Sequence, residues 1–208
     1  NKSVVVYGCK GVLPVKKATI NVGNAGTVAR FLTALLALQE GGEYSLDGSL
    51  PMRVRPMGGL LNVLESHGAK LEFKGEKNCF PFTIKTNALS NEDWEIDASA
   101  SSQILSAILL ISPLIPGEIR LNLIGETVSR PFVQMTVEMI HQFTENGSQK
   151  ITQNGNKFLI PDLNLNIESG NYAIEPDATA ASYFISLPLS VGGEIVVQNL
   201  QNCNLQGD

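Results

Sequence analysis

The sequence predicts an α/β (α+β) fold made of three copies of one β-α-β-α-β-β unit. Three apolar segments resemble one another: FLTALLAL at 31–38, ILSAILLI at 104–111 and YFISLPLS at 183–190. Each follows a small polar turn (NAGT, SASSQ or DATAAS), and each precedes a Gly-Glu pair and a strand-like stretch (GGEYSLDG, PGEIRLNLIG or GGEIVVQNL). The spacing of about 75 to 80 residues is too long for a solenoid but fits a repeated supersecondary unit.

The helices of the first copy follow from their apolar patterns. Residues 27–38 are apolar almost all round, which predicts a buried helix. A second helix is predicted to begin at Pro56, because a proline at the first helical position removes no helical hydrogen bond. Its pair His67-Gly68 supplies a C-terminal stop. Its apolar stripe has helical spacing and consists of Met57, Leu60, Leu61 and Leu64.

The second copy repeats this pattern. Its second helix is predicted to begin at Pro131 and to stop near 146–147. The apolar face of that helix carries Val133, Val137 and Ile140. Short alternating or β-branched stretches predict strands at 4–7, 70–73, 82–85 and 118–123. Trp94 is expected to be half-buried in a further strand.

The chain is expected to form one domain over residues 1–208, because no linker rich in Pro, Gly and Ser divides it. The units span approximately 18–86, 93–160 and 165–208, and the third stops where its second helix should begin. The chain has no initiator Met, and Gln206-Gly207-Asp208 resembles the start of a new element. We therefore expect a fragment of a longer protein.

Composition excludes several classes of function. With 208 residues and 43% hydrophobic residues, the chain can bury a core. A net charge of -5 argues against general binding to nucleic acid or to a membrane surface, which needs a basic footprint. The longest apolar run, 104–115, is broken by Ser and Pro and is too short to cross a bilayer. The scattered Cys9, Cys79 and Cys203 indicate neither a disulfide frame nor a zinc site and favour a reducing compartment.

Polar residues at helix starts are the candidates for ligand binding. Asn24 to Arg30 form an Asn-Ala-Gly-Thr turn before the first helix, where free backbone N–H groups favour anions and a glycine lets a ligand approach closely. The second copy places Ser101-Ser102-Gln103 at the equivalent start. Taken singly, each motif is more typical of an ordinary helix cap than of an anion site, and Arg30 has the alternative interpretation of a solvated charge. Together they indicate a doubly anionic small molecule.

Two Arg-Pro pairs also open equivalent helices. They are Arg55-Pro56 and Arg130-Pro131, the second preceded by Ser129. An arginine at a helix start opposes the helix dipole, so an anionic partner explains its presence. Arg53 has an equally good interpretation as a surface charge. In the third copy, Glu175 and Asp177 suit a helix cap better than proton transfer. His67 and His141 are interpreted as structural, and no His/Cys/Asp grouping has metal-ligand spacing.

The motifs in order resemble the 5-enolpyruvylshikimate-3-phosphate synthase family, over nearly the whole chain. The motifs that carry the resemblance are NAGTVARFL, MRVRPMGGLLNVLESHGA, SASSQILSAILLISPL, VSRPF, EPDATAASYF and LQGD. The resemblance implies transfer of the enolpyruvyl group of phosphoenolpyruvate to the 5-hydroxyl of shikimate 3-phosphate, with release of phosphate, in chorismate and aromatic amino-acid biosynthesis. It implies an inverted α/β barrel of two domains, each of three units, of which this chain supplies one substrate-docking domain. It also implies a cytoplasmic, monomeric complete enzyme that needs no metal or organic cofactor and is inhibited by glyphosate.

The resemblance divides the candidate residues by substrate. Those expected to bind shikimate 3-phosphate are Ser101, Ser102, Gln103 and Ser129. Those expected to bind phosphoenolpyruvate are Gly26, Arg55 and Gln103, with Gly26 at the wall where glyphosate also lies. The supporting residues are Asn24, Thr27, Arg30 and Arg130.

The chain also departs from the family pattern. Pro51, Phe31 and Phe132 stand where the family commonly has Arg, Pro and Tyr, and the lost Tyr hydroxyl removes a hydrogen bond worth about 0.5–1.5 kcal/mol. The family's proton-transfer groups belong mostly to segments outside this chain, so no catalytic residue is assigned here and the chain is expected to be inactive alone. Two alternatives remain: a paralogue such as the UDP-N-acetylglucosamine enolpyruvyl transferase, and a binding module without chemistry. The serine pair with Gln103 favours a compact phosphorylated ring over a nucleotide sugar.

Overall fold

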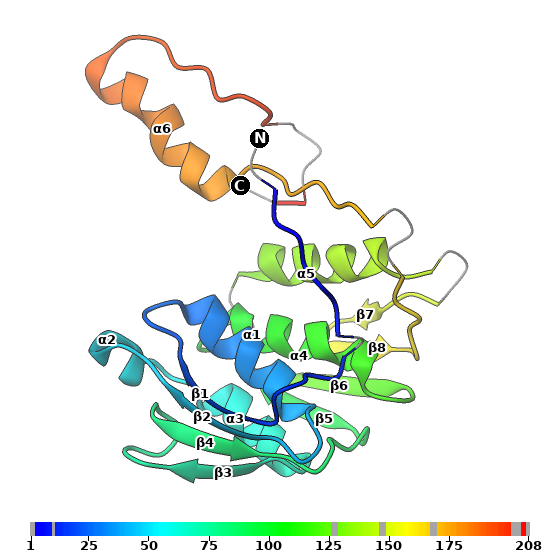
Figure 1. Cartoon of the computed structure of the whole chain (residues 1–208). Coiled ribbons are helices and arrows are strands. Elements are labelled where there is room, and N and C mark those ends of the chain that lie inside the picture. The colour runs from blue at the N-terminus through cyan, green and yellow to red at the C-terminus, as the bar shows by residue number, and fades with distance from the viewer. Residues whose placement is uncertain are drawn as a thin grey trace.

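Two four-stranded sheets with helices packed on them form the body of the protein (Figure 1). The computed structural model describes residues 3–9, 11–125, 129–145, 149–166, 170–200 and 205–206. The first unit comprises β1 (Lys17–Asn21), α1 (Gly26–Ala37), β2 (Glu43–Asp47), α2 (Leu50–Arg53), α3 (Gly58–Ser66), β3 (Lys70–Phe73) and β4 (Phe82–Lys85). The second comprises β5 (Trp94–Asp97), α4 (Ser102–Ile111), the 3-10 helix η1 (Ser112–Leu114), β6 (Ile119–Ile124), α5 (Arg130–Gln142), β7 (Thr152–Asn154) and β8 (Lys157–Ile160). The last described helix is α6 (Ala178–Val191).

The two units share one sheet topology. The strand orders are β1-β2-β4-β3 and β5-β6-β8-β7. In each sheet the first two strands pair in parallel across a helical crossover, and the remaining neighbours pair antiparallel. The observed order of elements therefore repeats, and a position in the first unit has a structural counterpart in the second.

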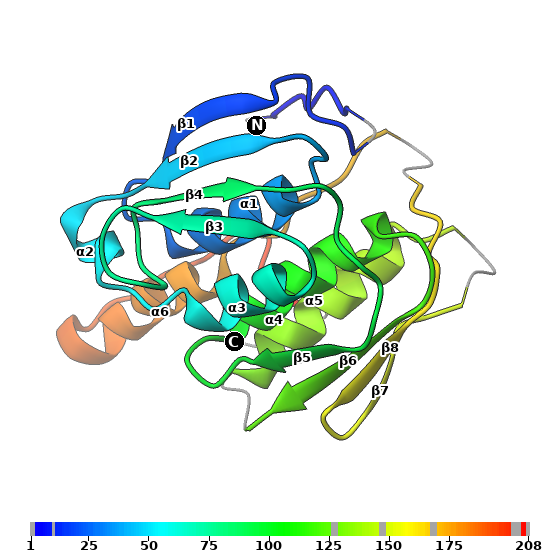
Figure 2. The same cartoon turned by 90° about the horizontal axis from the view of Figure 1, so that it is seen from below.

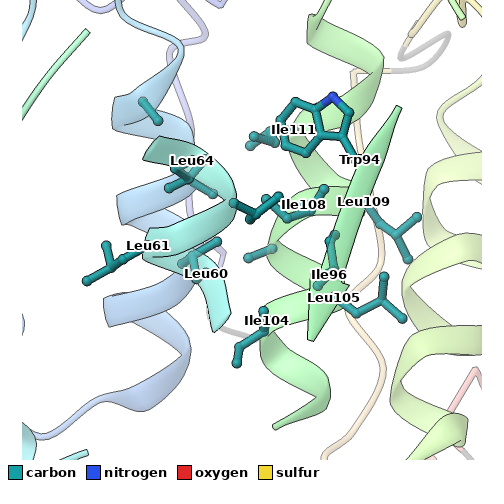
Figure 3. Close-up of a cluster of buried hydrophobic side chains, with 14 of the residues drawn as sticks. Leu60, Leu61, Leu64, Trp94, Ile96, Ile104, Leu105, Ile108, Leu109 and Ile111 are labelled. Atoms are coloured by element: carbon teal, nitrogen blue, oxygen red, sulfur yellow. The ribbon is translucent and has the colours of Figure 1, made fainter. Parts of the chain in front are cut away.

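The core lies where the helices of the two units meet. Helices α3 and α4 run between the two sheets (Figure 2), and α4 packs against both α1 and α5. Figure 3 shows the cluster of buried apolar side chains to which α3, β5 and α4 contribute. Those labelled are Leu60, Leu61, Leu64, Trp94, Ile96, Ile104, Leu105, Ile108, Leu109 and Ile111. Because one core joins both units, the starts of α1, α4 and α5 are held in fixed relation.

Most predicted elements form within a residue or two of their predicted bounds. The stripe of the second helix is confirmed, since Met57, Leu60, Leu61 and Leu64 are all fully buried. His67 ends α3, and Gly68 follows with a φ of 115°. The predicted start of that helix at Pro56 is wrong, because α3 begins at Gly58. The Pro56 carbonyl accepts a hydrogen bond from Arg30, and the Met57 N–H donates to the Asn78 carbonyl, so distant contacts hold this segment outside the helix.

Three further expectations are wrong. Residues 4–7 form no strand and are exposed, because no described strand lies beside them. Trp94 is fully buried rather than half-buried, since its ring stacks on His67 with centroids 4.0 Å apart. In the third copy the stretch 193–200 forms no strand, and the apolar side chains of α6 beyond Ala181 are largely exposed. Figure 1 shows α6 extending away from the sheets.

Some expectations fall on residues outside the described ranges: the helix stop at 146–147, Cys203, and the terminal Gly207-Asp208. No helix in the described ranges is both long and apolar enough to span a membrane.

Candidate functional site

The N-terminus of α1 has no side-chain cap. Gly23, with a φ of 59°, turns the chain after β1, and its N–H donates to the Asn21 side chain at 2.8 Å. Ala25 occupies the N-cap position of α1, where its methyl group cannot accept a hydrogen bond, and Gly26 is the first helical residue. The first N–H groups of α1 are therefore left to a ligand or to water.

Arg30, one turn into α1, is a buried cation with neutral partners. Its side chain is 4% exposed, and the Nη1 atom donates to the Gly26 carbonyl at 3.2 Å and to Gln103 Oε1 at 3.1 Å. Its Nη2 atom donates to the Pro56 carbonyl at 3.0 Å, whereas Nε is buried with no hydrogen-bond partner among the residues that the structure describes. Burial, and secondarily the charge of Arg55, lower the pKa of Arg30 below its ordinary value. The interpretation of Arg30 as a solvated charge is therefore wrong.

Gly26 leaves space where charged and polar groups converge. A Cβ atom at Gly26 would lie 2.9 Å from Arg55 Nη1, 3.1 Å from Arg30 Nη1 and 3.3 Å from Gln103 Oε1. Among the described residues, neither arginine forms an ion pair with a carboxylate. The structure thus brings together the residues assigned to phosphoenolpyruvate and leaves two positive charges available to an anion.

The second helix start carries hydroxyls and an amide. Ser101 caps α4, its Oγ accepting a hydrogen bond from the Gln103 N–H at 3.3 Å. Ser102 is buried at the first helical position. The Gln103 side chain reaches across to α1, where its Nε2 donates to Thr27 Oγ1 at 3.2 Å. Gln103 therefore links the two helix starts.

One pocket of about 880 Å³ opens at these helix starts. Its polar end is formed by Thr27, Ser101, Ser102, Gln103 and Ser129, which come from the starts of α1, α4 and α5. Its apolar wall is formed by Phe31, Leu110, Phe132, Met135, Met139 and Ile174. All four residues assigned to shikimate 3-phosphate thus line a single pocket, as required of one ligand.

Ser129 enters the pocket from an uncommon backbone conformation. It is the N-cap residue of α5 with φ 57° and ψ 55°, the left-handed region that few residues other than glycine adopt. Its side chain makes no capping hydrogen bond and lines the pocket. The hydroxyl is therefore not used to cap the helix, at a residue that lines the pocket.

Two supporting residues lie apart from this group. Asn24 is exposed in the turn before α1 and does not line the pocket. Arg130 borders a separate cavity of about 290 Å³ together with Gln134, Gln153 and Asn156. Arg53, left open from the sequence, forms a surface ion pair with Asp47. The arginines near the helix starts thus have different surroundings.

Of the two carboxylates in the acidic turn of the third copy, Asp177 caps α6 as predicted, whereas Glu175 accepts from a distant backbone N–H instead. The Oδ1 atom of Asp177 accepts from the Ala180 N–H at 2.8 Å, and Glu175 accepts from the Leu205 N–H at 3.0 Å. Both carboxylates also line the pocket. Sequence reasoning missed Ser106 and Thr136, whose hydroxyls bond at 2.8 Å between α4 and α5 and line the pocket floor. For Ser106, a hydroxyl residue inside the otherwise apolar α4 was the available signal.

Comparison with protein families and known sequences gives a consistent result. A family model described as EPSP synthase (3-phosphoshikimate 1-carboxyvinyltransferase) matches residues 1–208. A 3-phosphoshikimate 1-carboxyvinyltransferase of Trichormus variabilis is 38% identical over 205 residues, which are 99% of this chain and 47% of the relative. One from Janthinobacterium is 34% identical over 215 residues, covering 100% of this chain and 47% of the relative. The chain spans about half the length of the curated relatives that it matches.

A solved structure agrees with the sequence comparison. An EPSP synthase from Acinetobacter baumannii superposes with a TM-score of 0.61 at 25% identity, covering 81% of this chain and 35% of that one. The α/β architecture of two sheets with packed helices is thus that of an enolpyruvyl transferase domain.

Proposed function

The chain belongs to the EPSP synthase family, and we propose that it forms the part of the enzyme that docks both substrates. The complete enzyme would transfer the enolpyruvyl group of phosphoenolpyruvate to the 5-hydroxyl of shikimate 3-phosphate and release phosphate. The observation that carries the proposal is the convergence of three serine hydroxyls and Gln103 in one pocket, with two arginines that lack carboxylate partners beside it. The names of the curated relatives favour this acceptor over a nucleotide sugar.

Shikimate 3-phosphate is proposed to bind at the starts of α4 and α5. Its phosphate offers several acceptor oxygens, and the hydroxyls of Ser101, Ser102 and Ser129 supply donors around one pocket. The N-terminus of α4 adds the positive end of a helix dipole. This arrangement binds a compact anion without needing a net positive protein.

Phosphoenolpyruvate is proposed to bind at the start of α1. The exposed guanidinium of Arg55 suits its carboxylate or phosphate, the buried charge of Arg30 supports the site from behind, and Gly26 leaves space beside both. Glyphosate, also an anion, is proposed to occupy the same space. Replacing Gly26 with alanine should therefore weaken inhibition of the complete enzyme, and unchanged inhibition would remove Gly26 from that wall.

The proton-transfer step is proposed to need groups beyond this chain. Addition of the hydroxyl to phosphoenolpyruvate requires a base for the attacking oxygen and an acid for the enol carbon. It also requires a cleft closed to water, which we propose forms between this domain, with its units at 18–86, 93–160 and 165–208, and a second one. We expect the complete enzyme to be a cytoplasmic monomer and the 208-residue chain to release no phosphate when given both substrates. Measurable turnover by the chain alone would contradict this division.

Calorimetric titration of the 208-residue chain tests the substrate assignment. Shikimate 3-phosphate is expected to bind, and Ser102→Ala to weaken that binding by about tenfold, since one hydrogen bond to a charged group is lost. UDP-N-acetylglucosamine serves as the competing ligand. Binding of the nucleotide sugar in preference to shikimate 3-phosphate would favour the paralogous function. Phosphate release by the complete enzyme tests the non-catalytic alternative. A binding module would bind the substrates but release no phosphate.

A further inference from the structure

The Gln103 side-chain amide lies between a donor on one side and a hydroxyl on the other. We propose that Arg30 is a positioning residue that fixes this amide so that the pocket meets an N–H donor. The proposal rests on the proposed function only for the identity of the ligand, shikimate 3-phosphate. The orientation itself follows from the contacts of Arg30, Gln103 and Thr27.

The guanidinium of Arg30 decides which atom of the amide faces it. A guanidinium has donors and no acceptor, so the amide atom 3.1 Å from Arg30 Nη1 must be the oxygen. A flipped amide would set N–H against N–H. The nitrogen of Gln103 consequently faces away, toward Thr27 Oγ1 at 3.2 Å. One of its two hydrogens serves Thr27, and the second is left for the pocket that Gln103 lines.

Arg30 can fix the amide because it is itself immobilised. It is 4% exposed, and two further hydrogen bonds tie it to the Gly26 and Pro56 carbonyls. These contacts come from α1 itself and from the segment before α3, so the guanidinium cannot rotate without breaking them. Its planar, rigid fork makes the orientation at Gln103 specific.

The choice of an amide at position 103 is explained by the pocket rather than by Arg30. A glutamate there would give the buried guanidinium a carboxylate partner and a charge-assisted hydrogen bond. A carboxylate at neutral pH, however, has no hydrogen to donate. The glutamine therefore keeps a donor for a ligand oxygen at the expense of a stronger internal pair.

A double-mutant cycle on the 208-residue chain tests whether Arg30 acts through Gln103. We expect Arg30→Met and Gln103→Ala each to weaken binding of shikimate 3-phosphate by about tenfold. The double variant should bind no more weakly than Gln103→Ala alone, and Arg30→Lys should recover part of the loss because its ammonium can still donate to Oε1. Losses that multiply in the double variant would overturn the proposal. Arg53→Met, which removes a surface arginine, is the matched control and should bind as the unaltered chain does.

Gln103→Glu removes the N–H donor of the side chain while keeping the size of the side chain and its contact with Arg30. This variant is expected to melt at a higher temperature, because Arg30 gains a carboxylate, yet to bind shikimate 3-phosphate at least tenfold more weakly, because the donor is gone. A purely structural role predicts instead that tighter pairing leaves binding intact. Affinity of Gln103→Glu equal to that of the unaltered chain would overturn the proposal.

A readout in the free protein keeps the inference distinct from the proposed function. The Gln103 side-chain NH₂ signals in ¹⁵N spectra should exchange slowly with solvent in the unaltered chain and faster in Arg30→Met or, if that variant does not fold, in Arg30→Lys. Unchanged exchange would overturn the positioning role. If the unaltered chain binds no shikimate 3-phosphate, the proposed ligand fails, while this measurement still judges Arg30.

Discussion

The two complete units have the same topology but equip their helix starts differently. In the second unit, Ser101 caps α4 and the adjacent groups are hydroxyls and an amide. In the first unit, the N-cap of α1 is Ala25, and the adjacent groups are the guanidiniums of Arg30 and Arg55. The scaffold therefore sets where the donors lie, whereas side-chain identity sets whether they are neutral or charged. The proposed binding of two different anionic ligands, one at each helix start, matches that division.

The repeat also explains why Arg30 and Gln103 meet. Each residue immediately precedes the apolar segment that aligns between the units, 31–38 in one and 104–111 in the other. Because α1 packs on α4, equivalent positions of the two helices come together, and they bond at 3.1 Å. Equivalent positions of the two units thus carry a hydrogen-bond donor, Arg30, and its acceptor, Gln103.

The largest expected effect tests whether the two units depend on each other. Trp94 of β5 stacks on His67 at the end of α3, so its ring joins the second unit to the first. Trp94→Ala should lower the free energy of unfolding by about 3–5 kcal/mol, because a large buried ring leaves a cavity. Urea unfolding followed by circular dichroism measures this, since the chain has one tryptophan and its fluorescence is lost. Trp94→Phe is the control and should recover most of the loss. A loss below about 1 kcal/mol would show that the units are joined elsewhere.

Alanine substitutions at two glycines distinguish a glycine needed for packing between the units from a glycine that leaves space for a ligand. A Cβ at Gly59 of α3 would overlap the carbonyl oxygen of Asp97, which is backbone of the second unit. Gly59→Ala should therefore lower the free energy of unfolding by about 1–3 kcal/mol. At Gly26 the nearest atom is the free end of the exposed Arg55 side chain, which can move, and Arg30 Nη1 and Gln103 Oε1 at 3.1 and 3.3 Å need only small shifts. Gly26→Ala should therefore lower the free energy of unfolding by less than Gly59→Ala, by about 1 kcal/mol or less, while weakening phosphoenolpyruvate binding. Thermal unfolding of both variants gives the comparison, and equal losses would contradict it.

Exchanging caps tests the difference between the two helix starts directly. Ser101→Ala should cost about 1 kcal/mol of unfolding free energy, because the Gln103 N–H loses its acceptor. Ala25 has the extended backbone of an N-cap residue and no side-chain acceptor, so Ala25→Ser should add about 0.5–1 kcal/mol. Urea titrations measure both changes. A neutral result for Ala25→Ser would mean that the first turn of α1 is already satisfied by water.

The smallest effect is a pH dependence confined to the second unit. His141 Nε2 accepts a hydrogen bond from the Ile151 N–H at 3.1 Å, and burial lowers the pKa of His141. A lowered pKa means that the unfolded chain binds the proton more tightly, so the stabilisation is complete above the ordinary pKa of about 6.5 and declines as the pH falls below it. The hydrogen-exchange protection factor of the Ile151 amide, which corrects for the intrinsic slowing of exchange at lower pH, should fall between pH 7 and pH 5. His141→Gln should abolish this fall, and a fall that persists in the variant would assign it to another group.

Local patterns predicted those parts of the fold that depend on local chemistry. The stripe from Met57 to Leu64 and the hydroxyls at the start of α4 needed only helical spacing and the free N–H groups of a helix end. The start of α3 was mispredicted because the Pro56 carbonyl is bound by Arg30, 26 residues away. The burial of Trp94 likewise depends on His67, which lies in the other unit. The roles given to the candidate residues toward each substrate stay predictions until ligand binding is measured.

The bond between Arg30 and Gln103 spans 73 residues of sequence, so neither unit contains the site by itself. Because closing such a long stretch of chain has a high entropic cost, we expect this contact to form after each unit has its own sheet. Ligand binding therefore depends on the docking of the two units on each other, because only docked molecules contain the complete site. The apparent dissociation constant should rise in inverse proportion to the fraction of molecules in which the units are docked. A substitution that weakens the packing between the two units should therefore weaken ligand binding, even where the substituted residue lies far from the pocket.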